Sequence, residues 1–258
     1  MMSAAFWLLH ESLAREAPGS EASTRNAIQR LPPLPAAPQV LDVGCGPGAQ
    51  TLVLADTLRT RVAAIDIHQP FLDRLEKSAA ERGLAELIET RNLSMDVLDY
   101  PPESIDLIWC EGGIYLLGVP AALRLWRPML RRGGVVAFTE CTWLTAQRPA
   151  EAAAFWSDSY PAMTTVAANT EAAEREGYEV TATFPLPAHD WWAEYYTPLQ
   201  ERIDQLRTRD EPDLRAVLDE TQREIDLYAR HGDSYGYVFY VACKVDRPGG
   251  DRASFIGM

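Results

Sequence analysis

The stretch that most constrains the fold of this chain is Val40-Leu41-Asp42-Val43 together with the glycines at positions 44, 46 and 48. An apolar, β-branched run that ends in alternate glycines, followed by Thr51-Leu-Val-Leu-Ala, predicts a strand, a tight turn and a helix N-terminus. Glycines let the backbone turn sharply and let a ligand approach the main chain, and the free N–H groups at the helix start form a polar cradle. Ordinary strand-to-helix turns also contain glycine, so the turn alone does not identify a site.

Acidic residues after the neighbouring strands support a ligand site. The apolar segment Val62–Ile65 ends in Asp66, roughly 20 residues beyond the first glycine, where a carboxylate can accept hydrogen bonds from ribose hydroxyls. Asp96 follows Met95 after the next short strand-like segment and could accept from an adenine amino group. The G-x-G-x-G spacing differs from the G-x-G-x-x-G dinucleotide fingerprint.

Strands and helices alternate through the first half of the chain. This alternation predicts an α/β fold with a doubly wound sheet and right-handed crossovers. Ile105–Cys110 is a continuous apolar run of the kind found in a buried parallel strand, and Val135–Thr139 predicts a fifth strand. An N-terminal helix is expected over residues 3–16, and a long amphipathic helix over residues 212–230.

Five segments occur in the order and at the separations typical of one family. They read LDVGCGPG, AAIDIH, SMDVLDYP, IDLIWCEGG and LRRGGVVAFTE, and they cover about the middle half of the chain. In these segments the chain resembles the class I S-adenosylmethionine-dependent methyltransferases. The resemblance implies a Rossmann-like, doubly wound, seven-stranded sheet with an antiparallel last strand, N-terminal lid helices, and a helical, aromatic cap inserted after the fifth strand.

A closer resemblance extends over residues 10–244. The segments PGS and AST near the N-terminus, WCEGGIYLLG, TWLTAQRPAE and YGYVFY are similar to a group of bacterial small-molecule methyltransferases. That group is loosely associated with ubiquinone and menaquinone biosynthesis. Cofactor motifs dominate such comparisons and do not identify the acceptor.

The resemblance implies one methyltransferase domain over residues 1–246. Its expected parts are lid helices (1–35), a cofactor-binding core (36–141), a cap or substrate region with the sixth strand (142–232), and the last strand (235–244). The Gly- and charge-rich residues 247–258 are expected to be a disordered tail.

Cofactor residues follow from the same motifs. The resemblance implies that the glycines admit the methionine moiety of S-adenosyl-L-methionine, while Asp42 organises its amino group, Asp66 its ribose and Asp96 its adenine. The expected cofactor-binding residues are Asp42, Gly44, Cys45, Gly46, Gly48, Gln50, Asp66, Ile67, Met95, Asp96 and Glu111. The lid helices would place His10, Arg15, Ser23 and Thr24 near the pocket. The same sequence pattern is equally compatible with helices that merely cap the sheet.

Three residues are candidates for acid–base catalysis. Glu111 stands at the carboxyl end of the fourth predicted strand, where ligands gather in open α/β sheets, and could act as general base or as a capping carboxylate. His10 and His189 are alternative bases, and Glu140 at the end of the fifth strand is placed like Glu111. Methyl transfer depends chiefly on positioning, so a base is needed only if the acceptor loses a proton.

Aromatic residues are concentrated in the predicted cap. Tyr115, Trp143, Tyr160 and Tyr195 are expected to contact the substrate, although cap aromatics can equally form the core of that region. Aromatic faces attract ammonium and sulfonium groups.

Composition excludes several classes of function. A net charge of −13 and the lack of a basic run argue against nucleic-acid binding. The four cysteines form no C-x-x-C pair, which argues against zinc or disulfides, and no metal site is expected. No apolar run approaches the length of a transmembrane span, so a cytoplasmic protein without membrane contact is expected. The oligomeric state stays open, and the cap is compatible with a homodimer.

The sequence therefore predicts an S-adenosylmethionine-dependent methyltransferase that acts on a small-molecule O-, N- or C-nucleophile and releases S-adenosyl-L-homocysteine. A non-catalytic protein that binds the same cofactor is one alternative. An NAD(P)-dependent oxidoreductase is another, and it is disfavoured by the glycine spacing and by the lack of a Tyr-x-x-x-Lys pair.

Overall fold

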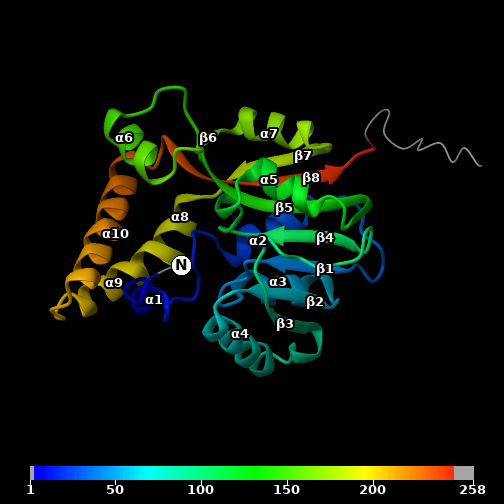
Figure 1. Cartoon of the computed structure of the whole chain (residues 1–258), viewed down its shortest axis with the longest axis horizontal. Coiled ribbons are helices and arrows are strands. Elements are labelled where there is room, and N and C mark those ends of the chain that lie inside the picture. Colours follow the sequence, from blue (N-terminus) through cyan, green and yellow to red (C-terminus); the bar gives the residue numbers. More distant parts are fainter. Residues whose placement is uncertain (1–2, 247–258) are drawn as a thin grey trace, which may run out of the picture.

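The computed structural model describes residues 3–246 (Figure 1), and the expected tail at 247–258 lies outside the described residues. The strands are β1 (Val40–Val43), β2 (Val62–Asp66), β3 (Ile88–Asn92), β4 (Ile105–Cys110), β5 (Leu130–Trp143), β6 (Thr164–Thr165), β7 (Tyr178–Pro185) and β8 (Tyr235–Lys244). The α-helices are α1 (Ala4–His10), α2 (Glu21–Ile28), α3 (Ala49–Leu58), α4 (Gln69–Glu81), α5 (Val119–Trp126), α6 (Ala150–Ser159), α7 (Val166–Arg175), α8 (Ala188–Trp191), α9 (Thr197–Leu206) and α10 (Pro212–His231). Shorter helical turns are η1 (Ala85–Leu87), η2 (Ile114–Leu116) and the π-helical η3 (Trp192–Tyr196).

Seven of the strands form a sheet in the order β3-β2-β1-β4-β5-β8-β7, and the two-residue β6 pairs with the end of β5. β1 pairs in parallel with β2 and β4, and β8 is antiparallel to both β5 and β7. The doubly wound α/β sheet with an antiparallel last strand is thus confirmed, and β6 raises the number of strands in the sheet to eight. The chain order reverses between β1 and β4, which is the position where open α/β sheets bind ligands.

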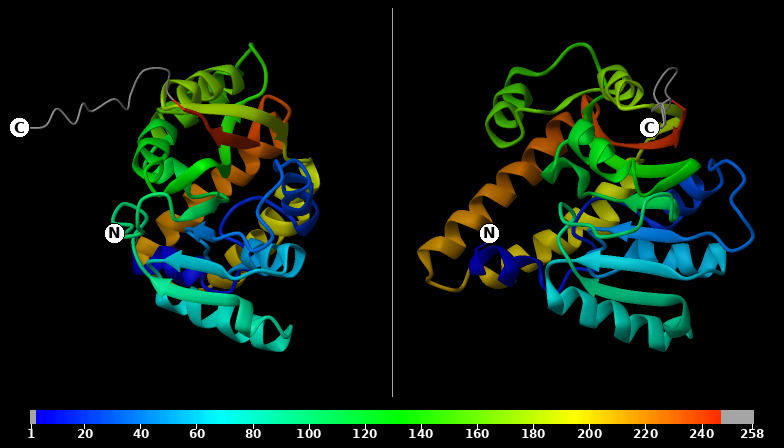
Figure 2. Two further views of the ribbon diagram at one scale, coloured as in Figure 1. Left: turned by 90° about the vertical axis from the view of Figure 1, so that its right-hand side faces the viewer. Right: turned by 45° about the vertical axis from the view of Figure 1, so that its right-hand side comes forward.

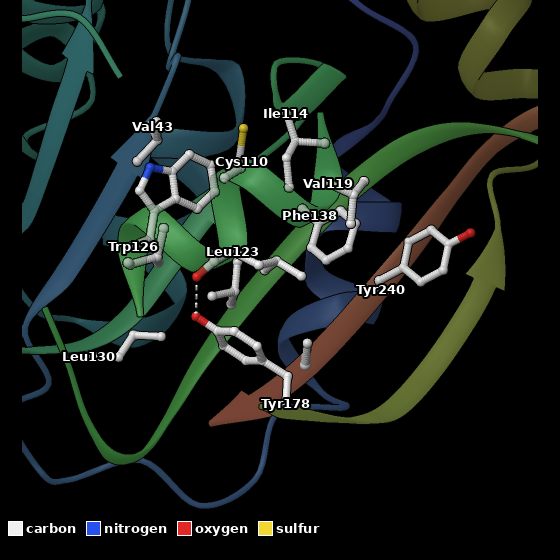
Figure 3. Packing of buried hydrophobic residues seen from close by; sticks show 14 of the residues in the cluster. Val43, Cys110, Ile114, Val119, Leu123, Trp126, Leu130, Phe138, Tyr178 and Tyr240 are labelled. Carbon is white, nitrogen blue, oxygen red and sulfur yellow. Dashed lines mark hydrogen bonds between the residues drawn. The ribbon is translucent and has the colours of Figure 1, made fainter. Parts of the chain in front are cut away.

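Helices cover both faces of the sheet because β1 and β4 are buried along their whole length and need apolar cover on each side. α2, α3 and α4 pack on one face, and α5 and α7 pack on the other (Figure 2). In the core on the α5 side, Phe138 stacks on Tyr240 at 5.0 Å (Figure 3). The Tyr178 hydroxyl donates a 2.9 Å hydrogen bond to the Leu123 carbonyl, which joins β7 to α5.

A second apolar cluster lies beyond the carboxyl ends of the strands. It consists of α1, α6 and α8–α10, and α1 packs against both α9 and α10 (Figure 1). α6 and α8–α10 lie within residues 142–232, and α1 adds the N-terminal part of the chain to the same cluster. None of the helices in residues 3–246 is long and apolar enough to span a membrane.

Two elements differ from the sequence-based boundaries. β5 extends from Leu130 to Trp143, because pairing with β8 continues as far as Trp143, well past the expected end at Thr139. The first helix ends at His10 and not at residue 16. Residues 11–20 then cross the carboxyl edge of the sheet without regular helix. This crossing brings the N-terminal part of the chain to the site described next.

Candidate functional site

A cavity of about 350 Å³ opens at the carboxyl ends of β1, β2 and β4. We call it the sheet cavity. Its floor comes from the turn after β1 (Gly44–Pro47), its sides from the ends of β2 and β4, and its cover from α1 and residues 15–18. The size lies in the range of small-molecule and cofactor pockets, which are usually apolar with a few placed polar groups.

The glycine turn approaches its neighbours closely. Gly44 and Gly46 have φ values of +67° and +54°, a conformation that glycine adopts without strain. A Cβ atom on Gly44 would lie 3.3 Å from Cε of Met95, and one on Gly46 would lie 3.4 Å from Cγ of Glu16. Both of these neighbours line the sheet cavity, so the missing side chains keep it open.

Gly48 has a different role from the other two glycines. It lies outside the lining of the sheet cavity, and a Cβ atom there would lie 2.2 Å from Cδ1 of Leu75 in α4. Gly48 thus permits α3 to pack against α4. The sequence grouped it with the cofactor-binding glycines because spacing does not reveal a contact with a helix that begins some 20 residues later.

Asp66 stands at the end of β2 and holds the glycine turn in place. Its Oδ2 accepts a 2.9 Å hydrogen bond from the Gly46 amide, and its Oδ1 accepts one of 2.9 Å from the His68 amide. A carboxylate has further lone pairs, so Asp66, which lines the cavity, can still accept from ligand hydroxyls.

Asp42 lies behind the turn and outside the cavity lining. Its side chain is fully buried and accepts from the Thr51 hydroxyl at 2.6 Å and from the Gln50 amide at 3.5 Å. Burial raises the pKa of Asp42 to about 7. Gln50 does line the cavity, so Asp42 can influence a ligand through Gln50 but does not contact the cavity itself.

Glu111, the first residue after β4, is surrounded by donors. Its Oε1 accepts from the Thr24 hydroxyl at 2.7 Å and from Nε1 of Trp109 at 2.9 Å. Its Oε2 faces Nη1 of Arg15 at 3.3 Å. We call residues 4–28, which contain α1 and α2, the lid; Glu111 therefore connects the lid to the sheet.

Tight packing accompanies this connection. A Cβ atom on Gly112 would lie 2.2 Å from Cβ of Ala17 in the lid. At the opposite side of the cavity, Trp7 of the lid stacks on His68 with ring centroids 3.8 Å apart. The lid thus covers the cavity from α1 through Pro18.

A second cavity of about 490 Å³ adjoins the first. We call it the aromatic cavity, because its lining includes rings from α1, α6, α8, η3 and β8. The two cavities share a wall whose members are Phe6, Glu16, Ala17, Pro18, Gly112 and Tyr115. Two adjoining cavities with a common wall can hold two ligands with their reacting ends next to each other.

Titratable groups line the aromatic cavity from α1, from residues 11–20 and from α10. Nδ1 of His10 lies 2.9 Å from Oε2 of Glu16, and both side chains are largely buried. The Tyr196 hydroxyl donates a 2.8 Å hydrogen bond to Glu224 in α10. Burial raises the pKa of both Glu16 and Glu224.

The structure brings most of the predicted site residues together. The sheet cavity is lined by nine of the predicted cofactor-binding residues: Gly44, Cys45, Gly46, Gln50, Asp66, Ile67, Met95, Asp96 and Glu111. The aromatic cavity is lined by His10, Tyr160 and Tyr195, and Tyr115 lines both cavities. Asp42, Gly48, Trp143 and His189 line neither.

Two of those four residues, His189 and Trp143, have their surroundings elsewhere. His189 is 67% exposed, and its nearest charged partner is Glu194 at 3.7 Å, because α8 carries its side chain to the surface. Trp143 is buried against Tyr235, and Arg148 covers its ring.

The sequence reasoning missed several lining residues, chiefly Phe6, Trp7, Glu16, Glu220 and Glu224. One signal for Glu224 was present. Positions 217, 221, 224 and 228 fall on one face of α10, and a glutamate is unusual in a stripe that otherwise contains valine, threonine and tyrosine. No comparable pattern marks the lid residues, whose placement depends on the crossing of residues 11–20.

Comparisons with known proteins agree with this geometry. Residues 40–134 match the family model described as a methyltransferase domain. The cypemycin N-terminal methyltransferase of a Streptomyces species is 32% identical over 160 residues, which are 56% of this chain and 58% of that relative. The matched part thus spans less than two thirds of the relative.

Solved structures share the fold. One of them is an S-adenosylmethionine-dependent methyltransferase from Geobacter sulfurreducens in complex with S-adenosyl-L-homocysteine. It superposes on this chain with a TM-score of 0.78 at 20% sequence identity, and the match covers 93% of this chain and 98% of the Geobacter chain. The cyclase SpnF superposes with a TM-score of 0.72 at 19% identity, over 91% of this chain and 86% of its own. The fold is therefore that of the class I methyltransferases, and that fold also carries an enzyme described as a cyclase.

Proposed function

We propose that this chain, whose residues 40–134 form a methyltransferase domain of the class I fold, transfers a methyl group from S-adenosylmethionine to a small molecule. The observation that carries the proposal is the pair of adjoining cavities. One follows the glycine turn and Asp66, as a cofactor site in this fold would, and the other meets it at Glu16 and Tyr115.

The lining of the sheet cavity fits S-adenosylmethionine. Gly44 and Gly46 leave space beside the main chain, and Asp66 presents a carboxylate for the ribose hydroxyls. Arg15, the only basic side chain among the described lining residues, suits the carboxylate of the methionine moiety. Oε1 of Glu16 is buried without a hydrogen-bond partner and can face the ligand's positive charge.

Apolar residues complete the fit. Ile67, Leu93, Met95 and Leu117 line the cavity together with Asp96, and they offer the apolar side chains that an adenine ring requires. When bound, S-adenosylmethionine supplies a methyl group attached to a positively charged sulfur. After the transfer, that sulfur is part of a neutral thioether.

The residues of this chain act chiefly by positioning. The lid covers the sheet cavity, and Glu111 holds the lid through Thr24 and Arg15. With its oxygens occupied by these donors, Glu111 is poorly placed to accept a proton from an acceptor, and it does not line the aromatic cavity. His10 and Glu16 do line that cavity, so we assign to this pair any proton removal that the acceptor needs.

The proposal is tested by turnover with S-adenosylmethionine that carries a deuterated methyl group. A panel of amines, phenols, thiols and enols serves as acceptors, and mass spectrometry detects the labelled product together with S-adenosyl-L-homocysteine. Labelled product from at least one class supports the transfer. Cofactor binding without product from any class would favour the non-catalytic alternative.

A further inference from the structure

We propose that the aromatic cavity binds a small amine in its ammonium form, with an apolar body attached to the charged group. This inference rests on the proposed function, since it names the acceptor class for the same site. It makes an amine nitrogen, and not an oxygen or a carbon, the atom that receives the methyl group.

The first argument is charge. Glu16, Glu220 and Glu224 line the aromatic cavity, while the described lining residues include no lysine and no arginine. His10 beside Glu16 is the one basic side chain among the described lining residues, so the three carboxyl groups outnumber it and disfavour an anionic ligand while favouring a cation. Burying the carboxylate of Glu224 becomes less unfavourable once an ammonium group lies beside it.

The second argument is the placement of these acids. Glu220 is exposed, and Glu224, one helical turn further along α10, is half-buried on the same face. Tyr196 donates to Oε1 of Glu224 and so orients its carboxylate. Glu16 lies on the wall shared with the sheet cavity. The acids therefore form a path from the surface to the point where the two cavities meet.

The third argument is the aromatic part of the remaining lining. Trp156, Tyr160, Trp191 and Tyr237 contribute ring surfaces to the same cavity. Ring faces attract cations, and their area accommodates an apolar ligand body.

The reaction balances with groups on this chain. An ammonium group must lose one proton before its nitrogen lone pair can bond to the methyl carbon. Glu16 at the shared wall, with His10 beside it in the aromatic cavity, is placed to take that proton. The nitrogen–carbon bond then forms as the carbon–sulfur bond breaks, its electron pair stays on sulfur, and the product is an N-methylammonium ion.

Calorimetric titration tests the inference without relying on activity. The full chain, saturated with S-adenosyl-L-homocysteine, is titrated with phenethylamine, with its neutral analogue phenethyl alcohol and with the anion hydrocinnamate; tryptamine and tryptophol form a second matched pair. We expect each amine to bind roughly tenfold or more tightly than its alcohol, in keeping with hydrogen bonds to charged groups, and hydrocinnamate to bind most weakly.

Variants test whether the preference for amines over alcohols depends on the glutamates of the aromatic cavity. Glu224→Gln keeps the size of the side chain and should weaken amine binding about tenfold while leaving alcohol binding nearly unchanged. Glu171→Gln, an exposed residue of α7 outside both cavities, is the matched control and should change neither. A short peptide with a free α-amino group, compared with its N-acetylated form, distinguishes a peptide terminus from a free amine as the natural source.

The outcomes separate the two proposals. Amines that bind no better than the alcohols, or that do not bind at all, would overturn the amine assignment while leaving methyl transfer intact. Failure of S-adenosyl-L-homocysteine to bind would instead overturn the proposed function.

Discussion

The hydroxyl of Thr24 donates a 2.7 Å hydrogen bond to Oε1 of Glu111, and this contact joins helix α2 to the end of strand β4 across 87 positions of the sequence. Trp109 and Arg15 complete the set of donors around the same carboxylate. The acid that sequence position marks as a catalytic base is thus, in its geometry, the group that holds the lid over the sheet cavity.

Replacing Glu111 should loosen the lid and destabilise the fold. Glu111→Ala leaves the Thr24 hydroxyl, the Trp109 ring N–H and the Arg15 guanidinium without their acceptor, which is expected to cost about 3 kcal/mol of unfolding free energy. Glu111→Gln keeps one acceptor oxygen and should cost less. Urea denaturation measures the stability and calorimetry the affinity for S-adenosyl-L-homocysteine; equal stability of Glu111→Ala and wild type would contradict the role of Glu111 as a structural anchor.

Substitutions at two glycines of the turn should have different effects, one chiefly on ligand binding and the other chiefly on stability. Gly46→Ala places a Cβ atom 3.4 Å from Cγ of Glu16 at φ +54°, and we expect S-adenosyl-L-homocysteine to bind at least roughly tenfold more weakly, with a loss of about 1–2 kcal/mol in stability. Gly48→Ala brings its Cβ within 2.2 Å of Leu75 and should lose more stability, about 3 kcal/mol.

Thermal and urea unfolding, combined with calorimetry, distinguish these two variants. The expected pattern is a fold that survives with weak binding for Gly46→Ala, and a weakened fold for Gly48→Ala. The reverse pattern would mean that the cavity is not lined by the turn as described.

Glu140 gives the fold a pH dependence. Neither of its carboxylate oxygens has a hydrogen-bond partner, and burial raises its pKa to about 8 from the ordinary 4.5, a shift that the nearby Tyr160 hydroxyl reduces only in part. The folded state therefore prefers the protonated acid. Its contribution to stability is complete below pH 4.5 and is lost as the pH rises through 8.

The test compares wild type with Glu140→Gln in urea at pH 5 and pH 9. From pH 5 to pH 9, the free energy of unfolding of wild type should fall on the order of 4 kcal/mol more than that of the variant. Asp42, whose pKa is raised to about 7, adds a further pH dependence of stability, and this is the same in both proteins. Parallel pH profiles for the two proteins would show that Glu140 ionises without penalty.

Asp66 should control cofactor affinity directly. Asp66→Ala removes an acceptor from the cavity and also frees the Gly46 and His68 amides, so the affinity for S-adenosyl-L-homocysteine should fall at least roughly tenfold. Asp99→Ala, at a side chain that is 71% exposed and paired with Arg91 outside the cavity, is the control. If both variants bind S-adenosyl-L-homocysteine equally tightly, Asp66 does not contribute to the binding site.

The parts of the fold that sequence predicts well are local. β1, its glycine turn and α3 lie within residues 40–58, and apolar patterning and turn chemistry act over that distance. β4 was expected at Ile105–Cys110 and was found there, because a strand buried on both faces is continuously apolar.

The parts that sequence misses depend on distant contacts. Glu224 is tied to Tyr196, Glu111 to Arg15, and the lid reaches the cavity only because residues 11–20 leave helical structure after His10. Trp143 resembled a substrate residue by composition, yet its position in β5 directs the ring against Tyr235. Which face an aromatic residue takes is decided by register and packing, and these do not show in its sequence neighbours.

The most direct measurement is calorimetric titration of the full chain with S-adenosyl-L-methionine and S-adenosyl-L-homocysteine, with NADH as the control ligand. The two sulfur ligands should bind at one site per chain in the micromolar range, and NADH should not bind. Binding of NADH, or no binding of either sulfur ligand, would contradict the assignment of the sheet cavity as a methyl-donor site.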